Sequence, residues 1–458
     1  MRTLTAAALL ALLFCAAHTA QQKPADLYNL GPVGGKASLT RHADKPALRI
    51  VEVFKDSPAA RAGLKPGDVL VGFEKDAYLE LGDAILKAEA DEHATLELAV
   101  RRGAEDLTLK VVLAHHKNTA DRDKAILSAA CKWLASQQDN EGAFRCTISP
   151  EVSQVVLTSL AGMAWLGAGY KPHEGEYAGN IVKAAEFVIE HVGEQKNHRK
   201  LQGKNNDQTN WSLGYGGIFL AHVLKTSDEK WLKRGPLKRL ESKLKWIRDR
   251  ILKQAEGDGG FGAGPGGANL LDYVHVEVVS NFCVAALGCI KQAGVDVPAD
   301  KLEPLLAYIE KCIGGDGGVH YSHDKMWGAE VGRTAGAMNA FAASGATGRE
   351  SYARMKAYFA KNRQHAFGGH STPTMHQLAV AIASAREGTL DEYWSEQGRE
   401  FTMVRNPDHT FASRPTADTQ RLGMNLDRDL GPVWTTAHWV LIVSLRTGGC
   451  PLLVSRGA

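Results

Sequence analysis

The hydrophobic and polar positions follow two different periods along this chain. Between residues 47 and 113 apolar and polar residues alternate, most clearly at Leu96, Leu98 and Val100. Alternation at period two predicts short strands with one buried face. From about residue 121 onward the apolar residues recur at steps of three and four, which predicts amphipathic helices. The chain is therefore expected to form a small β-rich domain followed by an all-α domain.

Within the helical part, amphipathic segments alternate with segments that are apolar nearly all round. A helix without a polar face must be buried on every side. Six amphipathic–apolar pairs fit two concentric rings, an (α/α)6 toroid over about residues 121–450, with the apolar helices inside. Five of the apolar segments are clear in the sequence, namely 155–166, 276–290, 331–343, 375–385 and 434–445.

A glycine-rich turn recurs between these helices. Its clearest copy joins Trp133-Leu134 to Gly142-Ala143-Phe144, and related turns contain Gly259 and Gly317. The spacing of about 58 residues, which shrinks in the later copies, is typical of a structural repeat. The 133–144 segment resembles the aromatic-Leu…Gln…Gly-x-aromatic element of the terpene-cyclase and protein-prenyltransferase toroids. That resemblance implies the fold only, because the Asp-x-Asp-Asp acid of those cyclases and the zinc ligands of those transferases are absent.

The segment from Ser57 to Leu70 resembles the PDZ domain of bacterial secreted proteases, and the resemblance covers roughly residues 28–115. It implies a peptide groove between the strand after Lys36 and the helix around Ala84. Strand addition would hold a peptide there. Pro32 offers no N–H group, so we expect little dependence on a terminal carboxylate. A domain used only for intramolecular packing is the alternative. The residues implied in peptide binding are Leu30, Gly31, Val33, Gly34 and Ile85.

The first twenty residues predict a signal peptide, with Arg2, an apolar run and small residues ending at Ala20. We therefore expect an exported protein, periplasmic or extracellular. The formal charge is only +3, which argues against nucleic acid as a partner. The uncharged stretch 152–170 is interpreted as a core helix, so no transmembrane span is expected after cleavage. The combination of a PDZ-like domain and a toroid resembles a group of uncharacterised secreted bacterial proteins.

Polar residues gather just before several apolar helices, where a toroid opens its central cavity. Convergent polar groups at a concave site predict ligand binding, here of an anionic or hydroxyl-rich ligand. Each residue alone is more simply a solvated or structural group, and Glu330 with Arg333 fits a helical ion pair. No motif implies a metal or cofactor. The cavity candidates are Asp272, His275, His320, His323, Asp324, Arg333, His370 and His376.

Three functions remain open at this point. The first is binding or scaffolding, with a peptide or protein segment in the N-terminal groove and a second ligand in a polar toroid cavity. The second is an enzyme acting on a polymer, such as a glycan lyase or hydrolase, which would need an acid and a base in one cleft. The third is a terpene-type cyclase.

Overall fold

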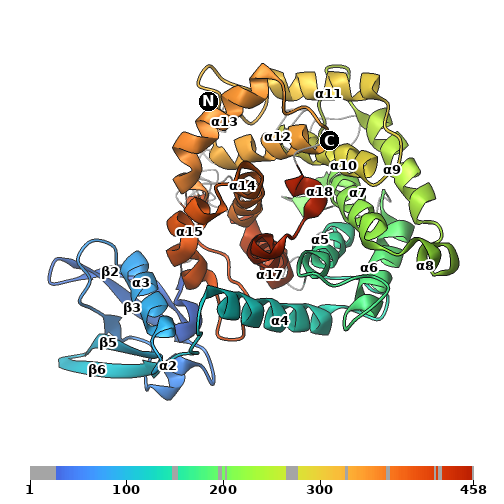
Figure 1. The fold of residues 1–458 in the computed structure, drawn as a ribbon. Coiled ribbons are helices and arrows are strands. Elements are labelled where there is room, and N and C mark those ends of the chain that lie inside the picture. The colour runs from blue at the N-terminus through green and yellow to red at the C-terminus, as the bar shows by residue number, and fades with distance from the viewer. Residues whose placement is uncertain are drawn as a thin grey trace, which may run out of the picture.

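The computed structural model describes residues 27–146, 153–193, 199–201, 204–264, 277–324, 328–367, 372–416, 419–420 and 425–455. The predicted signal peptide lies outside these residues. The described chain forms a small β domain followed by a ring of helices (Figure 1). The fold class predicted from the two hydrophobic periods is confirmed.

The N-terminal domain is a six-stranded antiparallel sheet in which each strand pairs with its neighbour in sequence. Along the fifth strand Leu96, Leu98 and Val100 are buried while the residues between them are exposed, as the alternation predicts. Two helices accompany the sheet, α2 (Pro58–Arg61) and α3 (Ala77–Ala90). The strands are β1 (Tyr28–Asn29), β2 (Gly35–His42), β3 (Lys45–Val53), β4 (Val69–Leu70), β5 (Thr95–Arg102) and β6 (Glu105–Val112).

In the described part of the chain, the helices of the ring form an outer and an inner circle (Figure 1). The outer helices are α4 (Thr119–Gln137), α6 (Ala178–His191), α9 (Leu240–Gln254), α11 (Ala299–Lys311), α13 (Glu350–Asn362) and α15 (Leu390–Val404). The inner helices are α5 (Gln154–Gly167), α7 (Thr209–Thr226), α10 (Glu277–Gln292), α12 (Val331–Ala343), α14 (Pro373–Glu387) and α17 (Leu426–Ser444).

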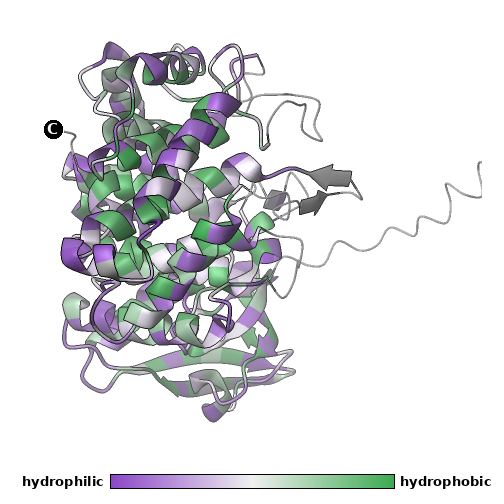
Figure 2. Ribbon diagram, turned by 90° about the vertical axis from the view of Figure 1, so that its right-hand side faces the viewer, coloured by the Kyte–Doolittle hydropathy of each residue, from purple (hydrophilic) through white to green (hydrophobic). Residues whose placement is uncertain are grey.

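Each inner helix packs against the next one in order, and α17 packs back against α5, so the inner ring is closed. The outer helices are amphipathic, and Figure 2 shows hydrophilic and hydrophobic residues alternating along helices of the ring. The inner helix α5 is buried at nearly every position, which confirms its interpretation as a core helix. No helix among the described residues is long and apolar enough to cross a membrane.

The recurring glycines turn the chain from an outer helix toward an inner one. Gly142, Gly259 and Gly317 have φ of +87°, +90° and +88°, a region that L residues rarely adopt. An added Cβ would lie 2.4, 2.2 and 2.4 Å from a backbone carbonyl oxygen of the next outer helix, those of Lys183, Pro304 and Arg354 respectively. The glycine is therefore required both by its backbone angle and by close approach.

Each turn is also held from the inner helix. The backbone N–H of Phe144 donates to Thr158 Oγ1 at 2.9 Å, and the N–H of Phe261 donates to Ser280 Oγ at 3.1 Å. Val319 and Phe411 donate in the same way to Thr334 and Thr436. A hydroxyl of an inner helix thus fixes each of these four turns, and in the first three it lies about one turn into that helix.

The remaining described elements are short. They are the 3-10 turns η1 (Gly31–Val33), η3 (Arg363–His365) and η4 (Leu445–Thr447), the hairpin β7 (Arg199–Leu201) and β8 (Lys204–Asn206), α8 (Glu229–Arg234), and α18 (Pro451–Val454). Helix α18 lies in the middle of the ring, beside α10, α12 and α14 (Figure 1).

Candidate functional site

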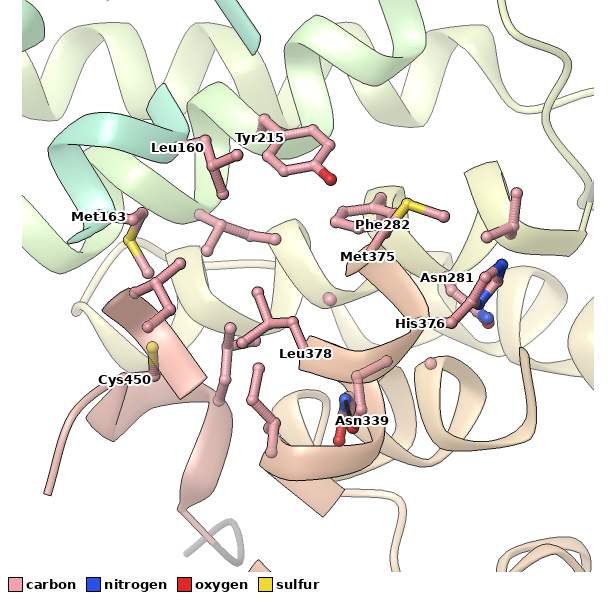
Figure 3. Close-up of a pocket in the computed structure, with 18 of the residues that line it drawn as sticks. Leu160, Met163, Tyr215, Asn281, Phe282, Asn339, Met375, His376, Leu378 and Cys450 are labelled. Atoms are coloured by element: carbon pink, nitrogen blue, oxygen red, sulfur yellow. Dashed lines mark hydrogen bonds between the residues drawn. The ribbon is translucent and has the colours of Figure 1, made fainter. Parts of the chain in front are cut away.

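A pocket lies inside the inner ring, with residues from all six inner helices in its wall (Figure 3). It contains about 750 Å³ of space not filled by protein atoms, including open solvent at its mouth. Its wall is formed by Leu160, Met163, Tyr215, Ile218, Val278, Asn281, Phe282, Ala285, Gly332, Gly336, Asn339, Met375, His376, Leu378, Ala379, Ile382, Leu441, Cys450 and Leu453.

The wall is apolar because the inward positions of the inner helices carry small and aliphatic side chains. On α10, Val278, Phe282 and Ala285 follow helical spacing and face the pocket. On α12, Gly332 and Gly336 let the neighbouring helices approach closely. An added Cβ would lie 2.4 Å from His376 Cβ at the first glycine and 2.9 Å from Asn281 Nδ2 at the second.

Aromatic rings line one side of the pocket. Tyr215 stacks on Phe282 with ring centroids 4.5 Å apart, and Trp434 lies 6.0 Å from Tyr215. Trp211 packs against Phe282 at 5.4 Å. In Figure 3, Tyr215, Phe282 and Met375 lie together, apart from Met163 and Cys450. Tyr215 and Phe282 belong to the pocket wall and offer a rigid, apolar surface to a ligand, while Trp211 and Trp434 support them from behind.

Four wall residues carry polar groups, and they differ in how well these are satisfied. Asn339 donates to Ala379 O at 3.0 Å and accepts from Arg386 at 2.8 Å. Tyr215 Oη and Asn281 Oδ1 are buried and have no hydrogen-bond partner among the described residues. Burial raises the pKa of the Tyr215 hydroxyl, so it remains a neutral donor. A buried polar atom without a partner is costly, so these two atoms are where a ligand would gain a hydrogen bond.

The structure differs from the predicted polar cavity. Of the eight candidates, His376 lines the pocket. Arg333 is buried. Its guanidinium forms an ion pair with the Glu330 carboxylate at 3.0 Å and donates a hydrogen bond to Gly328 O. His320, His323 and Asp324 precede α12 and are not part of the pocket wall. His320, His323 and Asp324 lie in the turn before α12, whereas the pocket wall is formed mainly by residues within the inner helices. Asp272, His275 and His370 lie outside the described residues, so their convergence stays a prediction.

The structure also reveals a buried acid that was not among the candidates. Glu277 begins α10 and is fully buried. Neither of its carboxylate oxygens has a hydrogen-bond partner among the described residues. Burial raises the pKa of Glu277 to about 8, although the Arg333 guanidinium and the Asn281 side chain oppose the shift. The side chain is therefore neutral below that pH. An acid at the start of an apolar helix was the available sequence signal.

A second buried acid has a structural role. Asp427, at the start of α17, accepts hydrogen bonds from Thr374 N at 2.8 Å and from Thr374 Oγ1 at 2.6 Å. Trp434 Nε1 donates to it at 2.8 Å. Burial raises the pKa of Asp427 to about 6. It joins the first turns of α14 and α17, so it helps to close the ring.

No group of three or more potential metal-ligating side chains occurs in the described parts of the chain. The six cysteines after the predicted signal peptide are all buried. Burial raises the pKa of the Cys450 thiol at the pocket to about 12, so it stays protonated and behaves as a small apolar group.

Residues 123–442 match the family model described as "Domain of unknown function (DUF6288)". The chain belongs to this family. The DUF6288 match extends from the first outer helix, α4, nearly to the end of the last inner helix, α17, so the family domain is the ring itself.

The chain is also similar to serine protease HTRA1 of Xenopus tropicalis, 43% identical over 65 residues. HTRA1 of Xenopus laevis is 40% identical over 65 residues. Each match covers 14% of this chain and 13% of the relative. The chain therefore spans only a small part of these curated relatives.

Two types of solved structure resemble the chain at low identity. The type II terpene cyclase MstE from Scytonema is 13% identical, with a TM-score of 0.46, covering 73% of this chain and 100% of that one. The GH76 α-mannanase BT2949 of Bacteroides thetaiotaomicron is 11% identical, with a TM-score of 0.48, covering 70% of this chain and 96% of that one.

The N-terminal domain docks on the last outer helix of the DUF6288 ring through the loop predicted to bind peptide. Leu30, Gly31, Val33 and Gly34 of that loop are buried, as is Ile85 on α3. An added Cβ on Gly31 would lie 2.7 Å from Thr402 O of α15. The predicted peptide-binding loop is thus covered by the chain itself.

Met403 of α15 reaches into the core of the N-terminal domain. It is fully buried and belongs to the apolar cluster that contains Leu30, Val33 and Ile85. An added Cβ on Gly82 of α3 would lie 3.3 Å from Met403 Cγ. A side chain of the ring therefore fills the apolar space between this loop and α3.

Polar contacts secure this junction. Asn29 Nδ2 donates to Met403 O at 2.9 Å and to Arg405 O at 2.7 Å. Arg405 forms a buried ion pair with Glu89 at 2.7 Å. A buried pair of this kind is costly to break because one charge is left without its partner. The two domains are joined by packing and by a fully buried charge pair.

Proposed function

We propose that the DUF6288 ring is a binding domain that holds one small molecule with an alkyl chain in its central pocket. The observation that carries this proposal is the composition of the wall, which is aliphatic and aromatic except for four polar side chains. Apolar surface removed from water drives such binding, at about 0.8 kcal/mol for each buried methylene. A sugar polymer would leave its hydroxyl groups without partners in this pocket.

The polar end of the ligand is proposed to bind beside Tyr215. Its buried hydroxyl lacks a partner within the described residues, so a ligand alcohol or carboxyl group there would accept the hydrogen bond. Such a bond contributes about 1 kcal/mol net. The expected ligand is therefore an alkyl alcohol or acid rather than a pure hydrocarbon.

Binding is favoured over polymer hydrolysis by the acids that the structure describes. Glycosidases use two carboxyl groups that flank the bond to be cleaved. No carboxyl group belongs to the described pocket wall. Glu277, although neutral, is not in that wall either, so it is not placed to protonate a ligand as a cyclase would require.

The N-terminal domain is proposed to act mainly as an intramolecular support, since Met403 occupies its apolar pocket. Peptide addition stays a prediction for the edge of β2, where β1 pairs only with Lys36 and Ala37. Comparison of free-acid and amidated peptides tests whether a terminal carboxylate matters there.

The pocket proposal is tested by filling the pocket. Ala379 lies in the wall and is not fully buried, so Ala379→Phe would project a ring into the space with little overpacking. We expect this variant to lose most of its affinity for decanol, measured by displacement of a fluorescent phenylnaphthylamine probe. Ala357→Phe, on the exposed face of α13, is the matched control and should bind normally. Equal affinity of both variants and the parent would reject the pocket as the binding site.

A further inference from the structure

The C-terminal helix α18 forms one end of the pocket. Gln292 Nε2, in the last turn of α10, donates to Leu452 O at 3.2 Å, and Ser455 Oγ donates to Gln292 Oε1 at 2.7 Å. Arg386, in the last turn of α14, donates to Leu453 O at 3.4 Å. The short helix is therefore held across the C-terminal ends of the inner helices.

The backbone before α18 directs its side chains in two directions. Cys450 has φ of +56°, unusual for a residue that is not glycine, and it is the residue before the first turn of α18. Cys450 and Leu453 belong to the pocket wall, whereas Leu452 is buried elsewhere in the core. Two adjacent leucines of one short helix thus have different surroundings.

The pocket has a limited depth above this helix. Its wall residues on α14 run from Met375 to Ile382, which corresponds to roughly 10 Å at the helical rise per residue. The partnerless Tyr215 hydroxyl lies on α7, and Figure 3 shows it well apart from Cys450. A ligand with its polar end at Tyr215 would therefore extend its chain toward Cys450 and Leu453.

We infer that α18 is the floor of the ligand site and sets the longest alkyl chain that the ring accepts, with Leu453 as the residue that determines specificity. This inference rests on the proposed function. Each methylene that fits should tighten binding about fourfold. A chain that exceeds the floor must displace Leu453 or leave its own end in water, so affinity should stop rising at a defined length.

The test compares two leucine truncations in the full-length protein. Hexanol, octanol, decanol, dodecanol and tetradecanol compete with the phenylnaphthylamine probe on the parent, on Leu453→Ala and on Leu452→Ala. We expect the chain length of tightest binding to increase by about three carbons, the number removed from the side chain, in Leu453→Ala. Leu452→Ala makes a similar cavity outside the pocket and should keep the length limit of the parent.

A second pair of variants covers the case in which a truncation does not fold. Leu453→Phe should shorten the accepted chain, and Leu452→Phe should leave it unchanged. An unchanged length limit in both Leu453 variants, with normal binding of short alkanols, would overturn the floor and leave the pocket proposal standing. Failure of every alkanol to bind the folded parent would overturn both.

Discussion

The two domains use apolar surface in opposite ways. In the N-terminal domain, the apolar cluster between the loop at Gly31 and helix α3 is completed by Met403 of the ring. The pocket of the ring is lined by all six inner helices and has α18 at one end. The same kind of surface therefore serves cohesion between domains in one region and is available to a ligand in the other. What distinguishes them is whether another part of the chain enters.

A buried glutamate in each region has different surroundings. At the junction Glu89 is paired with Arg405 at 2.7 Å. In the ring Glu277 has no hydrogen-bond partner among the described residues and has a raised pKa. Glu89 thus lies directly against a guanidinium, whereas at Glu277 the effect of burial outweighs the opposing effects of Arg333 and Asn281.

The largest expected effect comes from truncating one methionine in each pocket. Met403→Ala should lower the free energy of unfolding by about 2–5 kcal/mol, because it leaves a cavity in a packed core. Met375→Ala should lower it by less than half as much, because Met375 already borders open space. Denaturant unfolding of both variants measures the difference. Equal losses would show that the two pockets are packed alike.

The next effect distinguishes the two buried acids. Glu277 has a folded-state pKa of about 8 against 4.5 for the ordinary group, so the unfolded chain loses its proton first as the pH rises. Stability should therefore fall between those two values, by about 1.4 kcal/mol for each pH unit at most. Glu277→Gln removes this dependence, so the variant should match the parent near the lower value and exceed its stability near the upper one.

Denaturant unfolding at several pH values across this range measures the free energy of unfolding of the parent and of Glu277→Gln. Glu350→Gln, at an exposed position on α13, is the control and should keep the slope of the parent. A Glu277→Gln variant whose stability changed with pH as the parent's does would mean that the carboxyl is charged or paired in solution.

The smallest expected effect is on decanol affinity, when one buried tyrosine hydroxyl is removed from each domain. Tyr215→Phe should weaken decanol binding by about fivefold, which corresponds to about 1 kcal/mol for one hydrogen bond, and leave decane binding unchanged. Tyr78→Phe removes a hydroxyl that is also buried without a partner, but in the N-terminal domain, and should leave both affinities unchanged. A loss of decanol binding in the Tyr78 variant would indicate that the ligand binds in the N-terminal domain and would contradict the proposed site in the ring.

Much of the fold was predictable because it depends on local patterns. The period of two in β5 and the recurring glycines at Gly142, Gly259 and Gly317 follow from backbone geometry that each segment imposes on itself. The candidate site was harder to predict. The clustered polar residues of the turns predicted a site there. The pocket wall instead consists largely of small and aliphatic residues such as Ala285 and Ala379, which cannot be distinguished from ordinary core residues in a sequence.

The sequence by itself determined the two-part organisation, the alternation of outer and inner helices and the turns between them, because these depend on residues a few positions apart. Only the tertiary structure decided that Met403 enters the N-terminal core, 374 residues from the Asn29 side chain that binds its carbonyl. It likewise decided that Leu453 faces the pocket while Leu452 does not. Such contacts form only when the ring closes and brings distant segments together, and no local pattern records which side chain will then meet which surface.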